Sequence, residues 1–415
     1  QSLSCSGWVA KVSSIMASCR QCAIMTMRQT NGGDGMVLAS QRVLRPDGGF
    51  APATIHIDAG RITAVEDRIS PQAEQVDLAI VPGYVDTHCH GAAGADFTDE
   101  DPQKVRAAIE HHRANGTTTQ FASTVTERMD DLVDQIHRLR PIVAAGELAG
   151  IHAEGPFLAE NRRGAHNPEL LRDPSDAAVT RLLQAGEGDL RAVTLAPERE
   201  YGIRAVQTLT AHGVHAAFGH SDADAGITRE AVDAGADVVT HLFNAMAPIH
   251  HREPGPVPWL LTDSRTLIEL ICDGVHVAPD VLRMAIRTAG VERVALVTDA
   301  MSATGQPDGR YMLGTLPVQV DQGRARIRHA DGSLGAIAGS TLTMGGAVEF
   351  LVGSVGVALA DAATMAATTP ARWYGLDEVG VIEEGRLADL CLVDDAGHVE
   401  RVIRHGREID RPTLV

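Results

Sequence analysis

The chain has 415 residues, of which 44% are hydrophobic, and its formal net charge at pH 7 is −18. This length allows one large domain with a smaller one, and no apolar run approaches the roughly 18 residues of a membrane-spanning helix. The negative charge argues against a nucleic-acid or anionic-membrane surface, so an anionic substrate would need a local cluster of donors. The six cysteines are scattered along the chain. This distribution predicts free thiols and a reducing, cytoplasmic location.

The first 35 residues show neither strand alternation nor a helical stripe, and we expect a disordered or extraneous leader there. Lys11 and Arg20 interrupt its apolar pieces, so a secretory signal is a poor fit. Cys19 and Cys22 have the spacing of a metal or redox pair, but neither a second pair nor a βαβ pattern accompanies them. That context favours free thiols.

Both ends of the remaining chain have the pattern of short strands. Residues 36–80 alternate between apolar and polar and are broken by the turn signals 47–49 and 59–60, and a matching pattern returns over 311–332 and 381–415. We therefore predict a small β-sandwich built from both ends, in which residues 311–332 are an insertion or hairpin. A larger domain over 81–310 would lie between the ends, followed by C-terminal helices at 333–380.

The central segment alternates short apolar strands with amphipathic helices. The predicted strands cover residues 81–87, 117–124, 148–153, 190–196, 213–219, 237–241, 267–273 and 294–298. Helical patterns between them include 102–114, 127–139, 177–185, 203–211 and 279–289. Eight strands with crossover helices predict an α/β fold, a (β/α)8 TIM-like barrel. The alternative is an open doubly wound sheet, but no glycine-rich nucleotide loop accompanies the strands.

Histidines and carboxylates collect where these strands end, which is where such barrels place their chemistry. His88 and His90 stand one residue apart, so in a strand both side chains point to the same side and can approach one ion. The strand-end residues are His88, His90, His152, Glu154, Glu198, His220, His241, Asn244, His276 and Asp299. Imidazole and carboxylate without clustered cysteine predict a catalytic divalent ion with an open position. We expect Zn²⁺ first, with Fe²⁺, Co²⁺ or Mn²⁺ as alternatives.

Asp299 follows the apolar run 294–298 and is the candidate general base. A water bound to the ion would have its pKa lowered to about 7, and a base must then take its proton. Asp299 could instead be a helix N-cap or a purely ligating carboxylate, and both alternatives stay open.

Several longer motifs carry a resemblance to a known family. The series from His88-x-His90 through Glu154, His220 and His241 to Asp299 resembles the amidohydrolase superfamily, whose members use one or two metals in such a barrel to hydrolyse amides. Finer motifs resemble its deacetylases of N-acetyl amino-sugar phosphates. These motifs are Ile151-His152-Ala153-Glu154-Gly155-Pro156-Phe157-Leu158, Gly164-Ala165-His166, Gly219-His220-Ser221-Asp222-Ala223, Thr240-His241-Leu242-Phe243-Asn244-Ala245-Met246, Asp273-Gly274-Val275-His276, Thr298-Asp299-Ala300 and Ala338-Gly339-Ser340-Thr341-Leu342-Thr343-Met344.

The resemblance implies roles for individual residues. Glu154, His220 and His241 would hold the principal metal, His88 and His90 would complete a second position, and Asp299 would act as general base and then acid. His166 would lie near the acetyl carbonyl. The phosphate would be held by backbone N–H groups of Asn244 and Ala245, by His276, and by Arg252 reaching in from a neighbouring subunit, so a homodimer is implied.

The implied reaction removes the acetyl group of N-acetyl-D-glucosamine 6-phosphate and yields acetate and D-glucosamine 6-phosphate. Three alternatives stay open. The substrate could be the galacto epimer, which differs at one hydroxyl. It could be a cyclic amide, although Glu154 stands where those enzymes usually have a modified lysine. A non-enzymatic scaffold of the same fold is the third, although such proteins typically lose metal ligands.

Overall fold

The computed structural model describes residues 35–410, with 1–34 and 411–415 outside it. The predicted leader, with Cys19 and Cys22, therefore lies outside the described residues. Within the described part, none of the helices is long and apolar enough to cross a membrane.

Eight parallel strands form the central sheet, in the order β15-β14-β13-β12-β11-β10-β9-β6. They are β6 (Tyr84–Asp86), β9 (Thr117–Thr124), β10 (Gly150–Phe157), β11 (Leu190–Leu195), β12 (His215–Phe218), β13 (Ala236–Val239), β14 (Leu267–Ile271) and β15 (Val294–Val297). All eight predicted strands are present, and each is an almost continuous run of buried residues. Such runs are expected where helices cover a parallel sheet.

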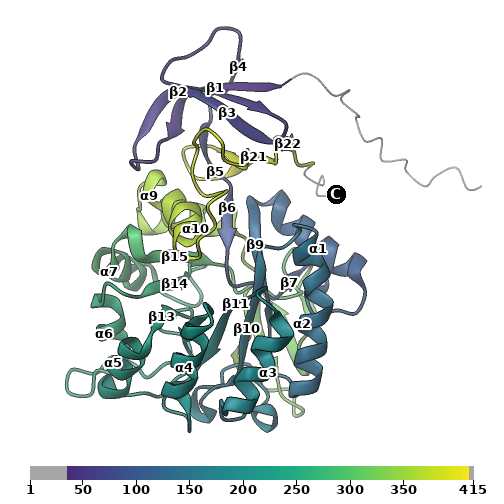
Figure 1. Ribbon diagram of the computed structural model, residues 1–415, viewed down its shortest axis with the longest axis vertical. Helices are drawn as coiled ribbons and strands as arrows, with labels where there is room; N and C mark the ends of the chain where they lie inside the picture. Colours follow the sequence, from purple (N-terminus) through teal and green to yellow (C-terminus); the bar gives the residue numbers. More distant parts are fainter. Residues whose placement is uncertain (1–34, 411–415) are drawn as a thin grey trace, which may run out of the picture. The chain divides into compact units, whose positions relative to one another are not determined.

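Helices alternate with these strands and lie outside them in Figure 1. The helices are α1 (Pro102–Ala114), α2 (Met129–Ala144), α3 (Asp176–Gly186), α4 (Gly202–Ala211), α5 (Ala225–Ala234), α6 (Val257–Thr262) and α7 (Pro279–Ala289). Each buries one stripe; in α7 the buried residues are Leu282, Ala285 and Ile286. The start of α1 follows local chemistry, because the Asp101 side chain accepts the N–H of Gln103. Helix α2 continues past the predicted end at residue 139 and includes Pro141, because Ile142 in its last turn is buried in the core.

The ends of the central sheet are tied together by hydrogen bonds. Thr298 Oγ1 donates to Asp86 Oδ2 at 2.6 Å, and Asp299 N donates to His88 O at 2.9 Å. The first bond connects Thr298, just after β15, with Asp86 in β6. The second connects Asp299 with His88, just after β6. The first and last strands therefore have their carboxyl ends side by side.

Both ends of the described chain meet in a second sheet with the order β22-β21-β20-β5-β1-β2-β3, in which β4 pairs with β1. Its strands are β1 (Met36–Leu44), β2 (Phe50–Asp58), β3 (Arg61–Glu66), β4 (Glu74–Gln75), β5 (Ala79–Pro82), β20 (Leu390–Val393), β21 (Val399–Arg404) and β22 (Arg407–Glu408). Strand β5 pairs with β20 antiparallel, with Leu390 opposite Pro82. In Figure 1 the purple and yellow strands belong to this sheet. It has its own core, which includes Ile55, Ile80 and Leu392.

A third sheet departs from the prediction. Strands β16 (Gly309–Leu313), β17 (Leu316–Asp321), β18 (Arg324–Arg328) and β19 (Leu334–Ile337) pair only with one another, whereas we expected residues 311–332 to be an insertion or hairpin of the β-sandwich built from both ends of the chain. The alternation was interpreted correctly as strand, but its partner was wrong. Alternation identifies a face that is half buried and does not say against which neighbour, and here that face packs on residues such as Val125 and Met301.

Short elements complete the described chain. They are the hairpin strands β7 (Gly91–Ala92) and β8 (Ala95–Asp96), the 3-10 turns η1 (Glu160–Arg162), η2 (Pro168–Leu170) and η3 (Val291–Arg293), and the C-terminal helices α8 (Met344–Phe350), η4 (Leu351–Val355), α9 (Leu359–Ala363), η5 (Thr364–Thr368) and α10 (Thr369–Trp373). The elements η4 and η5 are π-helical. Of these short elements, η1 is the one that reaches the site described next.

Candidate active site

Six predicted ligands come together at the carboxyl side of the parallel sheet. His88 and His90 follow β6, His220 follows β12, His241 follows β13 and Asp299 follows β15, while Glu154 lies within β10. All six side chains are largely buried. Because every strand of this sheet runs in the same direction, residues scattered over some two hundred positions reach one volume.

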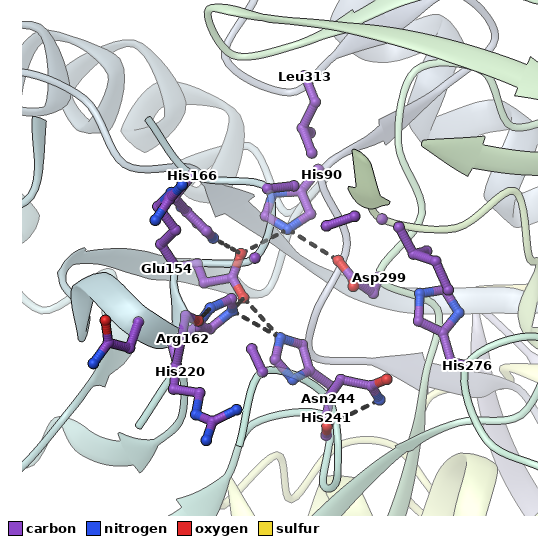
Figure 2. Close-up of a pocket in the computed structure, with 18 residues that line it drawn as sticks. His90, Glu154, Arg162, His166, His220, His241, Asn244, His276, Asp299 and Leu313 are labelled. Carbon is purple, nitrogen blue, oxygen red and sulfur yellow. Dashed lines mark hydrogen bonds and ion pairs between the residues drawn. The ribbon is translucent and has the colours of Figure 1, made fainter. Parts of the chain in front are cut away.

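Three of these residues converge on one point. His220 Nε2 and His241 Nε2 each lie 3.1 Å from Glu154 Oε1. The two nitrogens are themselves 3.1 Å apart. Figure 2 shows both rings pointing at the carboxylate.

A second group lies on the other side of the same carboxylate. His88 Nε2 is 3.3 Å from His90 Nε2, and His90 Nε2 is 3.2 Å from Asp299 Oδ1. Glu154 Oε2 lies 3.3 Å from His90 Nε2, and Glu154 Oε1 lies 3.6 Å from His88 Nε2. Glu154 thus stands between the two groups, with Oε1 toward His220, His241 and His88 and Oε2 toward His90.

The donor set fits a divalent cation. The Nδ1–H of His220 donates to the carbonyl of Arg162 at 2.9 Å. The other nitrogen, Nε2, is then unprotonated, and its lone pair faces Glu154. Lone pairs of His220 and a carboxylate repel unless a cation lies between them. Nitrogen ligands at about 2.0–2.1 Å from one tetrahedral ion would lie roughly 3.3 Å apart. The separations around Glu154 are close to this value.

Electrostatics favour ionised carboxylates. Burial alone would raise the pKa of Glu154, but the histidines around it, His88 and His166 foremost, hold that pKa well below its usual value. Burial also opposes ionisation of Asp299, but a hydrogen bond with His90 and the charge of His88 lower its pKa. Both carboxyls are therefore anionic at neutral pH, the form required of a ligand or a general base.

Three of the converging residues have an unusual backbone. His220, His241 and Asp299 have φ angles of +49°, +28° and +49°, in the left-handed region that non-glycine residues rarely adopt. Such conformations cost of order 1–3 kcal/mol each and concentrate at functional sites. The strand ends turn sharply here, and the turn directs each side chain inward.

A cavity of about 470 Å³ opens onto these residues. It is lined by His90, Glu154, Asn161, Arg162, Arg163, Gly164, Ala165, His166, His220, His241, Asn244, Ala245, His276, Asp299, Leu313, Ala336, Ile337 and Gly339. Its volume lies within the range of small-molecule sites, about 300–1,000 Å³. The third sheet supplies Leu313, Ala336 and Ile337, and the loop around η1 supplies the arginines.

His166, one of the predicted substrate contacts, lies in the cavity with a defined tautomer. The backbone N–H of Thr126 donates to its Nδ1 at 3.3 Å, so Nε2 carries the proton and faces Glu154 Oε2 at 3.2 Å. Burial lowers the pKa of His166 even though Glu154 opposes the shift. His166 is therefore a neutral N–H donor at pH 7.

The other predicted contacts have different positions. Asn244, Ala245 and His276 line the cavity, whereas Arg252 is exposed and does not line it. The backbone N–H of Asn244 donates to the carbonyl of His241 at 3.1 Å, so it is already engaged. Burial disfavours the charged form of His276, but the Asp273 carboxylate at 2.7 Å raises its pKa. The raised pKa favours the charged form of the ring, which suits an anionic group.

His152 was predicted at a strand end, but it belongs to neither of the two metal groups, which are Glu154, His220 and His241 on one side and His88, His90 and Asp299 on the other. Its Nδ1 lies 2.9 Å from Ser123 Oγ and its Nε2 lies 2.8 Å from Thr194 Oγ1, so both ring nitrogens are engaged by hydroxyls. Glu198 likewise accepts from Ser221 Oγ and supports the loop after β12. The sequence grouped both with the ligands because position alone does not show where a ring points.

Sequence reasoning missed Thr126 and Glu269. Thr126 acts through its backbone, which no side-chain pattern reveals. Glu269 is the one charged residue in the apolar strand Leu267–Ile271, and its Oε2 lies 3.2 Å from His88 Nδ1. A lone charge in a buried strand was a signal that could have identified it.

The chain belongs to the amidohydrolase family, because the family model described as "Amidohydrolase family" matches residues 79–409. Within this family, the chain is similar to deacetylases of phosphorylated N-acetyl amino sugars. The chain is 36% identical to an N-acetylgalactosamine-6-phosphate deacetylase of Escherichia coli O157:H7, over 89% of this chain and 98% of that protein. It is 32% identical to an N-acetylglucosamine-6-phosphate deacetylase of Vibrio furnissii, over 89% of this chain and 93% of that protein.

Solved structures agree with this grouping. A mutant of the N-acetyl-D-glucosamine-6-phosphate deacetylase of Mycobacterium smegmatis, in complex with N-acetyl-D-glucosamine-6-phosphate, is 43% identical with a TM-score of 0.86. The match covers 91% of this chain and 100% of that chain.

Proposed function

We propose that this chain removes the acetyl group from N-acetyl-D-glucosamine 6-phosphate and releases acetate and D-glucosamine 6-phosphate. The observation that carries the proposal is the convergence of His220, His241 and Glu154 within 3.1 Å, beside a second group containing Asp299. The match covers most of the length of a relative that is named for this activity. The similar structure from Mycobacterium smegmatis is a complex with this phosphorylated sugar.

The proposal includes the architecture that gives rise to the site. The parallel sheet closes into a (β/α)8 barrel, which the bonds between the segments after β15 and β6 support. Among the described residues, 36–80 and 381–410 would make up the small β-sandwich, 81–310 the barrel and 333–380 its C-terminal helices. The segment 311–332 belongs to the third sheet, which contributes to the cavity.

Glu154, His220 and His241 would hold the principal ion, and His88, His90 and Asp299 with Glu154 a second one. Zn²⁺ is the expected metal because imidazole and carboxylate are its usual ligands in catalytic sites, and Fe²⁺, Co²⁺ or Mn²⁺ suit similar sites. When bound, the ion supplies Lewis acidity that polarises the acetyl carbonyl and lowers the pKa of water.

The chain's own residues perform the proton transfers. Asp299 is held as a carboxylate, so it accepts a proton from the attacking water and later delivers it to the departing amine. His166 presents its neutral Nε2–H in the cavity and donates a hydrogen bond to the acetyl oxygen as charge develops there. Leu313 and Ile337 on the third sheet restrict water at the mouth of the cavity.

Phosphate binding would use the opposite part of the cavity. His276, whose pKa is raised by Asp273, and the backbone at Ala245 are the donors on this chain, with Asn244 beside them. Arg252 would complete the phosphate site of a neighbouring subunit, because its guanidinium is exposed and contacts His251 instead of its own cavity. The protein would thus be a homodimer. The buried thiols of Cys89 and Cys272 suit the cytoplasm.

A second candidate substrate is N-acetyl-D-galactosamine 6-phosphate. The specific observation in its favour is the 36% identity with an enzyme named for that epimer. The metal groups and the phosphate donors would serve either sugar, because the epimers differ only at one ring hydroxyl.

The test is acetate release from four sugars by the metal-loaded protein: the gluco and galacto N-acetyl sugars, each with and without the 6-phosphate. We expect release from the phosphorylated sugars only, faster for the gluco epimer. Faster release from the galacto epimer would select the second candidate. No acetate from any of the four sugars would refute the proposal.

A further inference from the structure

Glu269 is an anomaly in the centre of the parallel sheet. It lies in β14, between Ile268 and Leu270, and it is only 2% exposed. A carboxylate in such surroundings is strongly disfavoured unless it is paired. Its partners should therefore show what it does.

The partners of Glu269 are a metal-ligand candidate and the residue before it. His88 Nδ1 donates to Glu269 Oε2 at 3.2 Å, and Thr87 Oγ1 donates to Glu269 Oε1 at 3.2 Å. The proton of the His88 ring is thereby held on Nδ1. Nε2, which lies 3.6 Å from both Glu154 and Asp299, is then the nitrogen that would offer its lone pair to a bound ion.

The other three histidines of the two groups are supported differently. His220 Nδ1 donates to a backbone carbonyl, that of Arg162. His90 Nδ1 and His241 Nδ1 are buried without a hydrogen-bond partner among the described residues. Within residues 35–410, His88 is the one of the four rings whose outer nitrogen faces a carboxylate.

We propose that Glu269 is a positioning residue that fixes His88 as a ligand and so sets the affinity of the ion position formed by His88, His90 and Asp299. A carboxylate behind a metal-bound histidine fixes the tautomer and orientation of the ring and raises its basicity. This inference rests on the proposed metal-dependent function. Glu269 does not line the cavity.

The Glu269→Gln variant tests the proposal, because glutamine has nearly the same shape but removes the negative charge and replaces one of the two accepting oxygens with an NH2 donor. The full-length protein is stripped of metal with a chelator and titrated with Co²⁺ in a calorimeter. We expect the dissociation constant of one ion to rise about 10–100-fold, the usual effect of removing such a partner, while the other stays within about twofold. Both constants within twofold of the unsubstituted protein would overturn the proposal.

A matched control is Asp273→Asn, which removes a half-buried carboxylate from His276, a histidine outside the two groups of converging residues. We expect it to leave both Co²⁺ constants unchanged. If Asp273→Asn weakens the binding of the same ion as Glu269→Gln does, the effect comes from a general loss of negative charge, and the specific role proposed for Glu269 is wrong.

A double-mutant comparison separates positioning from a purely structural role. In a His88→Ala background, Glu269→Gln should cause no further loss of Co²⁺ affinity, because the residue through which it acts is gone. An equal loss in both backgrounds would overturn the proposal. If Glu269→Gln fails to fold, Thr87→Val replaces it, since this variant removes only the hydroxyl that donates to Glu269. Thr87→Val should weaken Co²⁺ binding at the same ion position, and unchanged Co²⁺ binding would overturn the proposal.

These results are independent of the sugar. Failure of the proposed function would appear as absent acetate release by the unsubstituted, metal-loaded protein. Failure of the Glu269 inference would appear as unaltered Co²⁺ binding, whatever the activity.

Discussion

Replacing Asp299 with asparagine is the most direct test of the proposed chemistry. Asp299 is only 8% exposed, and its Oδ1 lies 3.2 Å from His90 Nε2. Asparagine keeps the shape and an accepting oxygen at this position but cannot take a proton. We therefore expect the principal ion, held by Glu154, His220 and His241, to remain bound while the proton transfers fail.

The expected magnitude follows from the role. General acid–base catalysis typically contributes about 10²–10⁴-fold, so kcat should fall by that factor, which corresponds to about 2.7–5.4 kcal/mol in the barrier. The KM should change little, because Asp299 is assigned no contact with the phosphate or the sugar ring.

The assay is acetate release under saturating substrate, with metal content measured on the same sample. Asp189→Asn is a suitable control, since Asp189 precedes β11 at the opposite end of the strand and pairs with Arg140. Its kcat should be unchanged. A metal-loaded Asp299→Asn protein that loses less than about tenfold in kcat would remove Asp299 from the mechanism.

Three further predictions address the phosphate, the metal and the core. Arg252→Ala should raise KM for the phosphorylated sugar with little change in kcat; an unaltered KM in steady-state kinetics would refute its assigned contact. Glu154→Gln should lower bound metal at both positions, because His88, His90, His220 and His241 all lie within 3.6 Å of its carboxylate; full metal content by elemental analysis would contradict this. Burial lowers the pKa of His112 to about 4, against about 6.5 unfolded, so the unfolded chain binds an extra proton between these values. Stability should therefore be lost as pH falls from about 6.5 to about 4, by up to about 3 kcal/mol. His112→Gln should weaken this dependence in urea unfolding, and an identical pH dependence would count against the assignment.

The sequence predicted the framework of the site well, because a strand buried on both faces is a nearly continuous run of apolar residues and is easily recognised. The run Val294–Val297 is apolar throughout and Leu267–Ile271 is apolar except for Glu269, and the polar residue that follows each run marks the carboxyl end. In a sheet of parallel strands those ends coincide. The convergence of His220, His241 and Asp299 therefore followed from strand positions alone.

Side-chain direction could not be predicted in the same way. His152 and Glu154 are two residues apart in β10, yet His152 is engaged by Ser123 and Thr194 while Glu154 joins the metal groups. The strand's register against β9 and β11 places those two hydroxyls, and no local pattern contains that information. The partner of the strands over 309–337 was missed for a related reason, since it depends on distant residues.

In the proposed site, Glu154 would couple the two ion positions. Its Oε1 faces His220 and His241 at 3.1 Å, while its Oε2 faces His90 at 3.3 Å. An ion bound on one side withdraws charge from the carboxylate and weakens its attraction for an ion on the other side. The second position therefore depends on whatever else strengthens its ligands. Glu269 adds a negative charge behind His88 alone, and so offsets this loss on the side where it is needed.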